Sequence, residues 1–423
     1  MKFLFFLMLT FFLFSCSSTN EELNSESSTK DPVKNEELIE YKLKDCIDYV
    51  MFNESNKYFL NFLISKGYDL NNDFKISCNE ALLVTELDLG DSGYVNDLKG
   101  IESLKNLKKL SGFINTDVIN LYNNNSIEEL NLNKKKTTVT TGGINTAELT
   151  LIRKLILPNN SSLKILNCNY TNLFQILNTE KQSNLEYIYL NDTRLEGELD
   201  FSNSNKLKEV DLNNNYGITL IKFSNINNPN LISLKIGTKI NVANNNGLSK
   251  ISVNTFPNLQ SLDVSNNSLL DVNLTENKQL LNLEINRNQI KSLNLVNNEL
   301  LKSLNARNNT ILNLDVKKLI NLNVLTLGYN KISKIDLSNS TKLWNLEMNN
   351  NLLENIDLSN NSNLGYVNLN ENDLIYINLK NGKNSKLQRL NTKQNKIDCI
   401  SIDKGFIPDD TKWLKDSNTK YCY

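Results

Sequence analysis

Carboxylates are the side chains of this sequence best suited to chemistry, because the 423 residues include no histidine. That absence removes Ser–His and Cys–His nucleophile pairs, histidine zinc sites and histidine general bases. Asp263 and Glu284 form a candidate pair of carboxylates. They stand 21 residues apart, and a repeat of that length would place them on neighbouring strands, about 5 Å apart at the backbone, near the separation in retaining glycosidases. Hydrolysis would also need a closed pocket that raises one pKa, and the sequence supplies none, so we predict no catalytic activity.

A second group of oxygen ligands lies in the stretch DLNNDFKISCNE, residues 69–80. Its pattern, D-x-[DN]-x-[DN] with Glu in the twelfth place, has the spacing of an EF-hand calcium loop. The sixth place, normally Gly because the turn needs a positive φ, is Phe74, which costs about 1 to 2 kcal/mol there. Two interpretations stay open: a structural calcium site, or a metal-free polar turn within a cap. The ligands of a calcium site would be Asp69, Asn71, Asp73, the backbone carbonyl of Lys75, Ser77 and Glu80.

These residues belong to a sequence whose later part repeats every 21 residues. The stretch LEINRNQIKSLNL, residues 283–295, puts two groups of apolar residues on either side of Asn288, and the same frame recurs over more than a hundred residues. Each copy has apolar residues in the first, fourth and sixth places, Asn in the ninth place and a second apolar pair behind it. The copies begin at Leu259, Leu280, Leu301, Leu322, Leu343 and Leu364.

The frame L-x-x-L-x-L-x-x-N-x-[LI]-x-x-[LI]-x-L is that of the leucine-rich repeat. Looser copies raise the number of coils to about fourteen, each with one short strand, so the sequence predicts an α/β solenoid. We expect a leucine-rich-repeat horseshoe or arc with a parallel β-sheet on its concave face. The ninth Asn is interpreted as structural, since its amide can bond the backbone of the turn. The looser copies begin near Val84, Leu107, Ile127, Leu163, Leu185, Leu207, Leu231 and Leu387.

The N-terminus has the pattern of an export signal. An apolar run from Phe3 to Phe14 is too short to span a bilayer, so residues 1–15 are predicted to be a signal peptide. The stretch that ends at Cys16, Leu-Phe-Ser-Cys, resembles the bacterial lipobox, which implies that Cys16 carries acyl chains such as palmitate. Residues 16–44 would then be the lipidated cysteine and a flexible acidic tether. The predicted location is the outer membrane, with exposure at the cell surface as one option.

The cysteines indicate how both ends of the solenoid are closed. The export context permits disulfides, and Cys46 and Cys78 flank the first segment of the fold while Cys399 and Cys422 flank the last, so we predict one disulfide in each cap. Cys168 stands in an inward sixth place, where a free cysteine packs as a small apolar residue. The predicted domains are a helical N-terminal cap with the EF-hand-like loop at 45–83, the repeats at 84–398 and a C-terminal cap at 399–423.

The chain resembles a bacterial leucine-rich-repeat surface lipoprotein, internalin-like in its short repeats and capped ends. The resemblance covers most of residues 45–423 and rests on the repeat frame, the passage LKGIESLKNLKKL and the closing C-I-x-I-D segment. It implies that the concave sheet binds another macromolecule and that the protein is not an enzyme. With 46 basic and 47 acidic residues, the net charge of -1 gives no general attraction for nucleic acid.

Binding residues are expected in the third, fifth, seventh and eighth places of the coils, which point away from the core. Most of these are Asn, Ser or Thr, and the exceptions include Tyr and Arg, the types that most often dominate interfaces. They form one cluster in the middle coils and one nearer the C-terminus. Loops inserted at 134–150 and 237–247 would add surface. The candidates are Tyr170, Tyr187, Tyr189, Glu284, Arg287, Arg307, Tyr329, Glu347, Tyr366 and Arg389.

The sequence therefore predicts a monomeric cell-envelope lipoprotein that binds a protein or glycan on the envelope or on another cell. Its membrane contact would be the lipid anchor only, and no cofactor is expected apart from structural calcium. A structural envelope spacer without a dedicated ligand is the alternative, and a carboxylate-based hydrolase is a third and weaker one.

Overall fold

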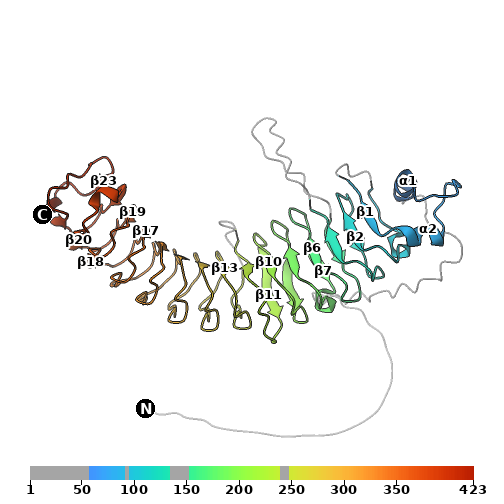
Figure 1. Ribbon diagram of the computed structural model, residues 1–423, viewed down its shortest axis with the longest axis horizontal. Coiled ribbons are helices and arrows are strands. Elements are labelled where there is room, and N and C mark those ends of the chain that lie inside the picture. The colour runs from blue at the N-terminus through green and yellow to red at the C-terminus, as the bar shows by residue number, and fades with distance from the viewer. Residues whose placement is uncertain (1–56, 91–94, 134–151, 239–246) are drawn as a thin grey trace, which may run out of the picture. The chain divides into compact units, whose positions relative to one another are not determined.

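The computed structural model describes residues 57–90, 95–133, 152–238 and 247–423, which consist mainly of short strands joined by turns (Figure 1). Two α-helices, α1 (Lys57–Ser65) and α2 (Cys78–Leu83), precede the strands. Within these ranges no helix combines the length and the apolar character that a membrane span requires. The predicted signal peptide, Cys16, the tether and most of both inserted loops lie outside the described residues. Single turns of 3-10 helix occur at η2 (Ile101–Ser103), η3 (Thr179–Lys181) and η4 (Asn384–Lys386).

A 15-stranded parallel sheet runs through the coils, and its strand order follows the chain. Most of these strands have three residues with the middle one buried, because successive side chains of a strand point to opposite faces. One face therefore packs on the core and the other meets solvent. The strands are β1 (Glu86–Asp88), β2 (Lys109–Ser111), β4 (Glu129–Asn131), β6 (Ile165–Asn167), β8 (Tyr187–Tyr189), β10 (Glu209–Asp211), β12 (Ser233–Lys235), β13 (Ser261–Asp263), β14 (Asn282–Glu284), β15 (Ser303–Asn305), β16 (Val324–Thr326), β17 (Asn345–Glu347), β19 (Tyr366–Asn368), β21 (Arg389–Asn391) and β23 (Trp413–Leu414).

Three smaller parallel sheets lie on the other side of the coils, where β7, β11, β18 and β20 are labelled in Figure 1. They form where the segment that carries the second apolar pair is extended enough to hydrogen-bond to the same segment of the neighbouring coil. Their strands are β3 (Val118–Asn120), β5 (Lys154–Ile156) and β7 (Gln175–Leu177); β9 (Glu196–Phe201) and β11 (Gly217–Phe223); and β18 (Asn355–Asp357), β20 (Tyr376–Asn378), β22 (Cys399–Ser401) and β24 (Lys420–Cys422).

In-register rows of apolar side chains form the core. The fourth-place row runs from Leu262 through Leu283 and Leu304 to Val367, and its six members are at most 3% exposed. Burying one such side chain contributes about 1.5 to 3 kcal/mol, and only stacking of coils can bury it. Cys168 is unpaired and 2% exposed, at the inward place that the sequence predicted. The predicted solenoid is confirmed, with turns instead of α-helices closing the coils.

The ninth-place Asn joins neighbouring coils through its side-chain amide. In Asn288, Nδ2 donates to the carbonyls of Val264 and Ile285, each at 3.0 Å, and Oδ1 accepts from the Leu269 amide at 3.0 Å. Each amide thus satisfies backbone groups of two coils, which confirms the structural interpretation of this residue. The same three bonds recur at Asn309, Asn330, Asn351 and Asn372.

A second row of buried amides supports the opposite turn, and the sequence analysis did not find it. Asn277 Nδ2 donates to the Val253 and Phe256 carbonyls of the preceding coil at 2.8 and 2.9 Å, and Asn298 and Asn361 donate in the same way. All three Asn side chains are 0% exposed. They occupy the nineteenth place of the frame, where other coils carry Leu or Ser, so no fixed residue type marks it.

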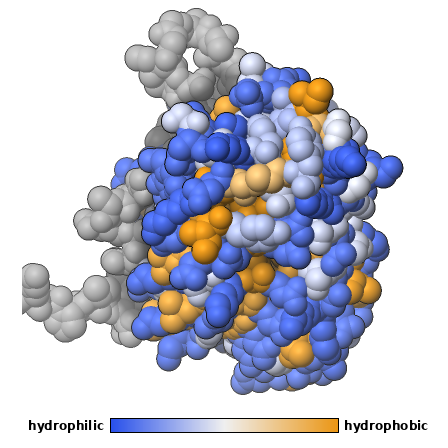
Figure 2. All heavy atoms as spheres, turned by 90° about the vertical axis from the view of Figure 1, so that its left-hand side faces the viewer, coloured by the Kyte–Doolittle hydropathy of each residue, from blue (hydrophilic) through white to orange (hydrophobic). Residues whose placement is uncertain are grey.

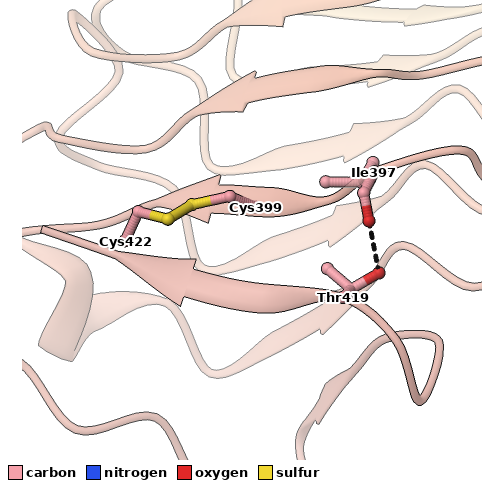
Figure 3. Close-up of a disulfide and its surroundings, with 4 residues drawn as sticks. All are labelled: Ile397, Cys399, Thr419 and Cys422. Carbon is pink, nitrogen blue, oxygen red and sulfur yellow. Dashed lines mark hydrogen bonds between the residues drawn. A yellow bond between two sulfur atoms is a disulfide. The ribbon is translucent and has the colours of Figure 1, made fainter.

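A disulfide closes the C-terminal cap. Cys399 in β22 and Cys422 in β24 form the predicted pair, and Thr419 Oγ1 donates to the Ile397 carbonyl at 2.8 Å between the same two coils (Figure 3). The cross-link thus holds the last strand of the smaller sheet against its neighbour. The predicted Cys46–Cys78 pair stays a prediction, because Cys46 lies outside the described residues.

Aromatic side chains cover the last coil beside this disulfide. Trp413 is 2% exposed, donates from Nε1 to the Leu387 carbonyl at 3.0 Å, and packs against the rings of Phe406 and Tyr421. Figure 2 shows this end of the molecule, where isolated apolar side chains reach a mostly polar surface. The cap therefore shields most of the apolar surface that the end of a solenoid would otherwise expose.

Candidate interaction site

The solvent side of the 15-stranded sheet, here called the sheet face, carries the candidate binding residues. In β14 and β17 the fourth-place Leu is buried, whereas the third and fifth places are exposed or half-buried. Neighbouring strands lie about 4.8 Å apart, so side chains from successive coils can touch. The sheet face is therefore a surface on which side chains far apart in sequence can act together.

Most coils turn at their eighth residue through the left-handed region of the backbone. In ten coils the φ angle at this place lies between 52° and 63°. Four of these residues are Asn, which adopts this conformation more readily than other residues with a side chain. Tyr170, Arg287 and Tyr329 occupy the same place, at a cost of about 1 kcal/mol each. Strained residues on an exposed face indicate a role that backbone stability alone does not explain.

Three candidate residues from successive coils meet on this face, and we call them the cation–aromatic cluster: Arg307, Tyr329 and Glu347. The Arg307 guanidinium lies 4.6 Å from the centre of the Tyr329 ring and 3.7 Å from Glu347 Oε2. Gly328 clears the space between these coils, because a Cβ there would lie 2.6 Å from Asn349 Oδ1. The guanidinium is thereby held in place and keeps N–H donors for a partner.

A second contact on the same coils joins Tyr366 to Trp344, a residue that the sequence analysis missed. Their ring centres are 4.8 Å apart in an edge-on arrangement, and Trp344 is 42% exposed. The indole lies against Gly365, where any Cβ would overlap it. Trp344 stands in the second place of its coil, beside the sheet face and not on it. An unusual Trp in a place that is otherwise mostly polar was the available signal.

The middle cluster is a pair of stacked rings tied to the next strand. Tyr187 and Tyr189 lie with ring centres 6.2 Å apart, and Tyr189 donates to Glu209 Oε2 at 3.0 Å. Burial and this hydrogen bond raise the pKa of Tyr189 to about 12. The Lys208 ammonium lies 5.5 Å from the Tyr187 ring and 2.6 Å from Glu186. The two rings form a stacked aromatic platform.

The remaining candidates are more isolated. Tyr170 and Arg287 are half-buried at the turns of their coils, and the Arg287 amide donates to the Arg307 carbonyl at 2.8 Å. Arg389 is exposed and pairs in register with Tyr366. Of the ten candidates, the structure thus brings Arg307, Tyr329 and Glu347 together. It separately brings Tyr187 together with Tyr189.

The carboxylates considered for hydrolysis are engaged in hydrogen bonds across the sheet. Asp263 and Glu284 are register neighbours in β13 and β14. Ser265 donates to Asp263 at 2.7 Å, and Asn305 donates to Glu284 at 2.8 Å. Burial, together with the charge of Asp263, raises the pKa of Glu284. The two acids thus form part of the polar lattice of the sheet face.

The candidate calcium loop is arranged around backbone amides. Phe74 has a φ of 62°, the positive value that the sequence analysis expected for the sixth place. Glu80 accepts from the amides of Ser77 and Leu70, each at 2.7 Å, and the bond from Ser77 is the main cause of its lowered pKa. Each oxygen of Glu80 thus accepts one backbone hydrogen bond, and calcium binding by this loop stays a prediction. Within the ranges described, no group of three or more Asp, Glu, His or Cys residues could hold a metal ion.

Comparison with known proteins identifies the architecture. No family model matches the sequence, and no curated protein matches it. Among solved structures, the functional domain of InlJ from Listeria monocytogenes is 23% identical, with 82% of this chain and 64% of that chain covered and a TM-score of 0.51. The fold is the leucine-rich-repeat solenoid.

Two further solved structures are similar to this chain, and the first of them shares its fold. A TDR receptor is 16% identical, with 81% of this chain and 70% of that chain covered and a TM-score of 0.52. An internalin, InlF of Listeria monocytogenes, is 18% identical, with 87% and 95% covered and a TM-score of 0.47. The chain spans just under two thirds of the InlJ domain. At these identities the leucine-rich-repeat fold is shared, and function has to be argued from the site.

Proposed function

We propose that this leucine-rich-repeat protein binds a protein partner through its sheet face, with the cation–aromatic cluster at the centre of the contact. The observation that carries the proposal is the convergence of Arg307, Tyr329 and Glu347 from three coils. Tyr and Arg dominate the binding energy of many interfaces, and a side chain that is already fixed loses less entropy on binding.

Backbone strain supports the same proposal. Tyr329 and Arg287 occupy the left-handed eighth place, where Asn would be more stable. Residues that lower stability on an exposed surface are common at binding sites, because selection keeps them for function. Tyr366 in β19 would extend the contact beside the cluster, since Tyr is among the residue types enriched at binding hot spots.

The cellular setting of the proposed binding follows from the N-terminal sequence. We infer that Cys16 carries acyl chains and that the protein is an outer-membrane lipoprotein. Of the two faces of that membrane, the outer one would expose the protein at the cell surface. Two acyl chains suffice for stable anchoring, because each buried methylene contributes about 0.8 kcal/mol. The flexible segment between Cys16 and Asp45 would act as a tether, so that the sheet face could bind a partner at some distance from the bilayer.

A pull-down with two matched variants tests the proposal. The chain from Ser17 would be presented to solubilised envelope proteins and, separately, to envelope polysaccharides. The site variant carries Arg307→Gln and Tyr329→Asn, which suit the local backbone, and the control carries Lys331→Gln and Tyr376→Asn on other faces. We expect the parent and the control to retain one protein that the site variant loses at least tenfold.

Other outcomes separate the alternatives. If the parent retains a polysaccharide that the site variant does not retain, the partner of the sheet face is a glycan and not a protein. Equal retention by all three proteins would rule out the cation–aromatic cluster and favour binding through the inserted loops. If none of the three proteins retains a partner, an envelope spacer without a dedicated ligand is favoured.

A further inference from the structure

Taken together, the turns that lead into the strands of five successive coils carry an unbalanced charge, which comes from three of them, 316–324, 337–345 and 379–389. We call residues 295–303, 316–324, 337–345, 358–366 and 379–389 the lead-in turns. They hold eight basic residues and one acidic residue, Glu299, in a chain that is nearly neutral. The turns that follow the strands of the same coils, 310–313, 331–334, 352–355, 373–376 and 396–399, hold three of each sign. The eight basic residues are Lys302, Lys317, Lys318, Lys342, Lys380, Lys383, Lys386 and Arg389.

Most of these charges have no ion-pair partner. Lys318 pairs with Glu299 at 3.1 Å and Lys317 with Asp336 at 3.5 Å, but in the described parts of the chain no ion pair involves the other six. Lys342 and Lys386 donate to Asn side chains of the preceding coil at 2.6 and 3.3 Å, which leaves their charge intact. All six are exposed. Asp315, Asp336 and Asp357 border the turns and accept hydrogen bonds from the backbone amides two residues further on. Asp403 accepts from the amides of Gly382 and Asn384 in the last turn.

Large apolar side chains stand among the basic residues on the same turns. Val296, Leu300, Ile320 and Trp344 are 46%, 40%, 54% and 42% exposed. Adjacent turns are tied together, for example by Asn321 Nδ2, which donates to the Glu299 carbonyl at 3.3 Å. A soluble polyanion would use only the charges of such a surface. An anionic bilayer would use the charges and also take up the apolar side chains.

We propose that the lead-in turns are a docking surface for an anionic lipid bilayer. The Lys and Arg side chains bind the headgroups, while Leu300, Ile320 and Trp344 enter the boundary between headgroups and acyl chains, where Trp is favoured. Apart from Arg389, which stands on the sheet face in β21, the surface lies beside that face, and it does not depend on the proposed partner. It adds a second membrane contact to the predicted acyl anchor and would hold the solenoid on its edge, with the sheet face open to a partner.

Vesicle binding tests the charge component of this surface. The chain from Ser17, which carries neither the predicted signal peptide nor an acyl group, would be sedimented with vesicles of equimolar phosphatidylglycerol and phosphatidylcholine, or of phosphatidylcholine alone. We expect binding only to the anionic vesicles. The variant Lys302→Gln, Lys342→Gln, Lys386→Gln should bind about 100-fold more weakly, since each Lys contributes about fivefold near an anionic surface. The matched variant Lys331→Gln, Lys334→Gln, Lys396→Gln should bind as the parent does.

Tryptophan fluorescence tests insertion. The chain has two Trp residues, and Trp344 is 42% exposed whereas Trp413 is 2% exposed, so a blue shift on adding vesicles reports Trp344. We expect that shift with anionic vesicles and its loss in Trp344→Phe. The proposal is overturned if anionic vesicles are not bound, if both Lys variants bind equally, or if dextran sulfate binds as tightly while vesicles cause no shift.

Discussion

At the scale of single residues, the sheet face combines backbone strain with fixed aromatic and cationic groups. The eighth place of the frame requires a positive φ, which Asn meets in four coils and Tyr or Arg meet in three. The sequence could predict that Tyr329 and Arg307 are exposed, because the frame fixes which places face inward. It could not predict the contact of Trp344 with Tyr366, because the indole lies against Gly365 of the next coil.

Replacing a strained residue should stabilise the protein. We expect Arg287→Asn to raise the free energy of unfolding by about 0.5 to 1 kcal/mol, because Asn tolerates the φ of 55° better than Arg does. The reverse change in the next coil, Asn308→Arg, should lower it by a similar amount. Urea unfolding of both variants measures the effect, and a loss of stability in Arg287→Asn would show that the Arg side chain contributes to folding.

The raised pKa of Glu284 leads to a prediction about pH. A carboxyl whose pKa is higher in the folded state destabilises the protein above that pKa, and the penalty disappears as the pH falls through it. We therefore expect Glu284→Gln to raise the free energy of unfolding at pH 7 and to have no effect below about pH 4, where the unfolded acid is also protonated. Urea unfolding at both pH values measures this. The same gain at both would rule out a titration effect.

At the scale of elements, hydrogen bonds between coils hold the turns while apolar rows hold the strands. The ninth-place Asn was predictable because it recurs in every regular coil. The nineteenth-place row was not, since Leu319 and Ser340 interrupt Asn277, Asn298 and Asn361. Because the residue type at this place varies, the sequence shows no pattern there. The amide hydrogen bonds of the three Asn residues are nevertheless equally regular in space.

Removing one ninth-place amide should destabilise two coils. Asn288→Ala leaves the Val264 and Ile285 carbonyls and the Leu269 amide without their partners, and we expect a loss of about 2 to 4 kcal/mol. Asn288→Asp should also destabilise, because a carboxylate cannot donate. The exposed Asn360→Ala is the control and should change stability by less than about 0.5 kcal/mol. Hydrogen exchange should place the loss in β13 and β14.

The C-terminal disulfide should stabilise its end of the solenoid. Cys399 and Cys422 are 23 residues apart, and a loop of that size contributes about 3 kcal/mol in the chain-entropy model. We expect Cys399→Ser with Cys422→Ser to lose that amount, mainly in the last coils, because repeats unfold in neighbouring groups. Trp413 fluorescence in a Trp344→Phe background reports the cap. An unchanged unfolding curve would mean that the aromatic contacts alone hold it.

At the scale of the whole molecule, the 21-residue period was enough to predict a solenoid with one continuous parallel sheet. The period fixes which residues face inward and which coils are neighbours, and the structure confirms both in the regular coils. The period carries no information about the ends of the chain, so the lipid anchor, the domain limits and calcium binding stay predictions. The period also does not reveal the excess of basic residues on the lead-in turns, because these turns become neighbours only in the folded solenoid.

Site-specific photo-crosslinking is the measurement that tests the central claim most directly. A photoreactive phenylalanine would replace Tyr329 on the sheet face or Tyr376 on β20, which are 43% and 45% exposed and so are matched in access. On intact cells that make the protein, we expect position 329 to give one discrete adduct with another protein and position 376 to give none. The absence of an adduct at 329, or the same adduct at both positions, would contradict partner binding by the sheet face.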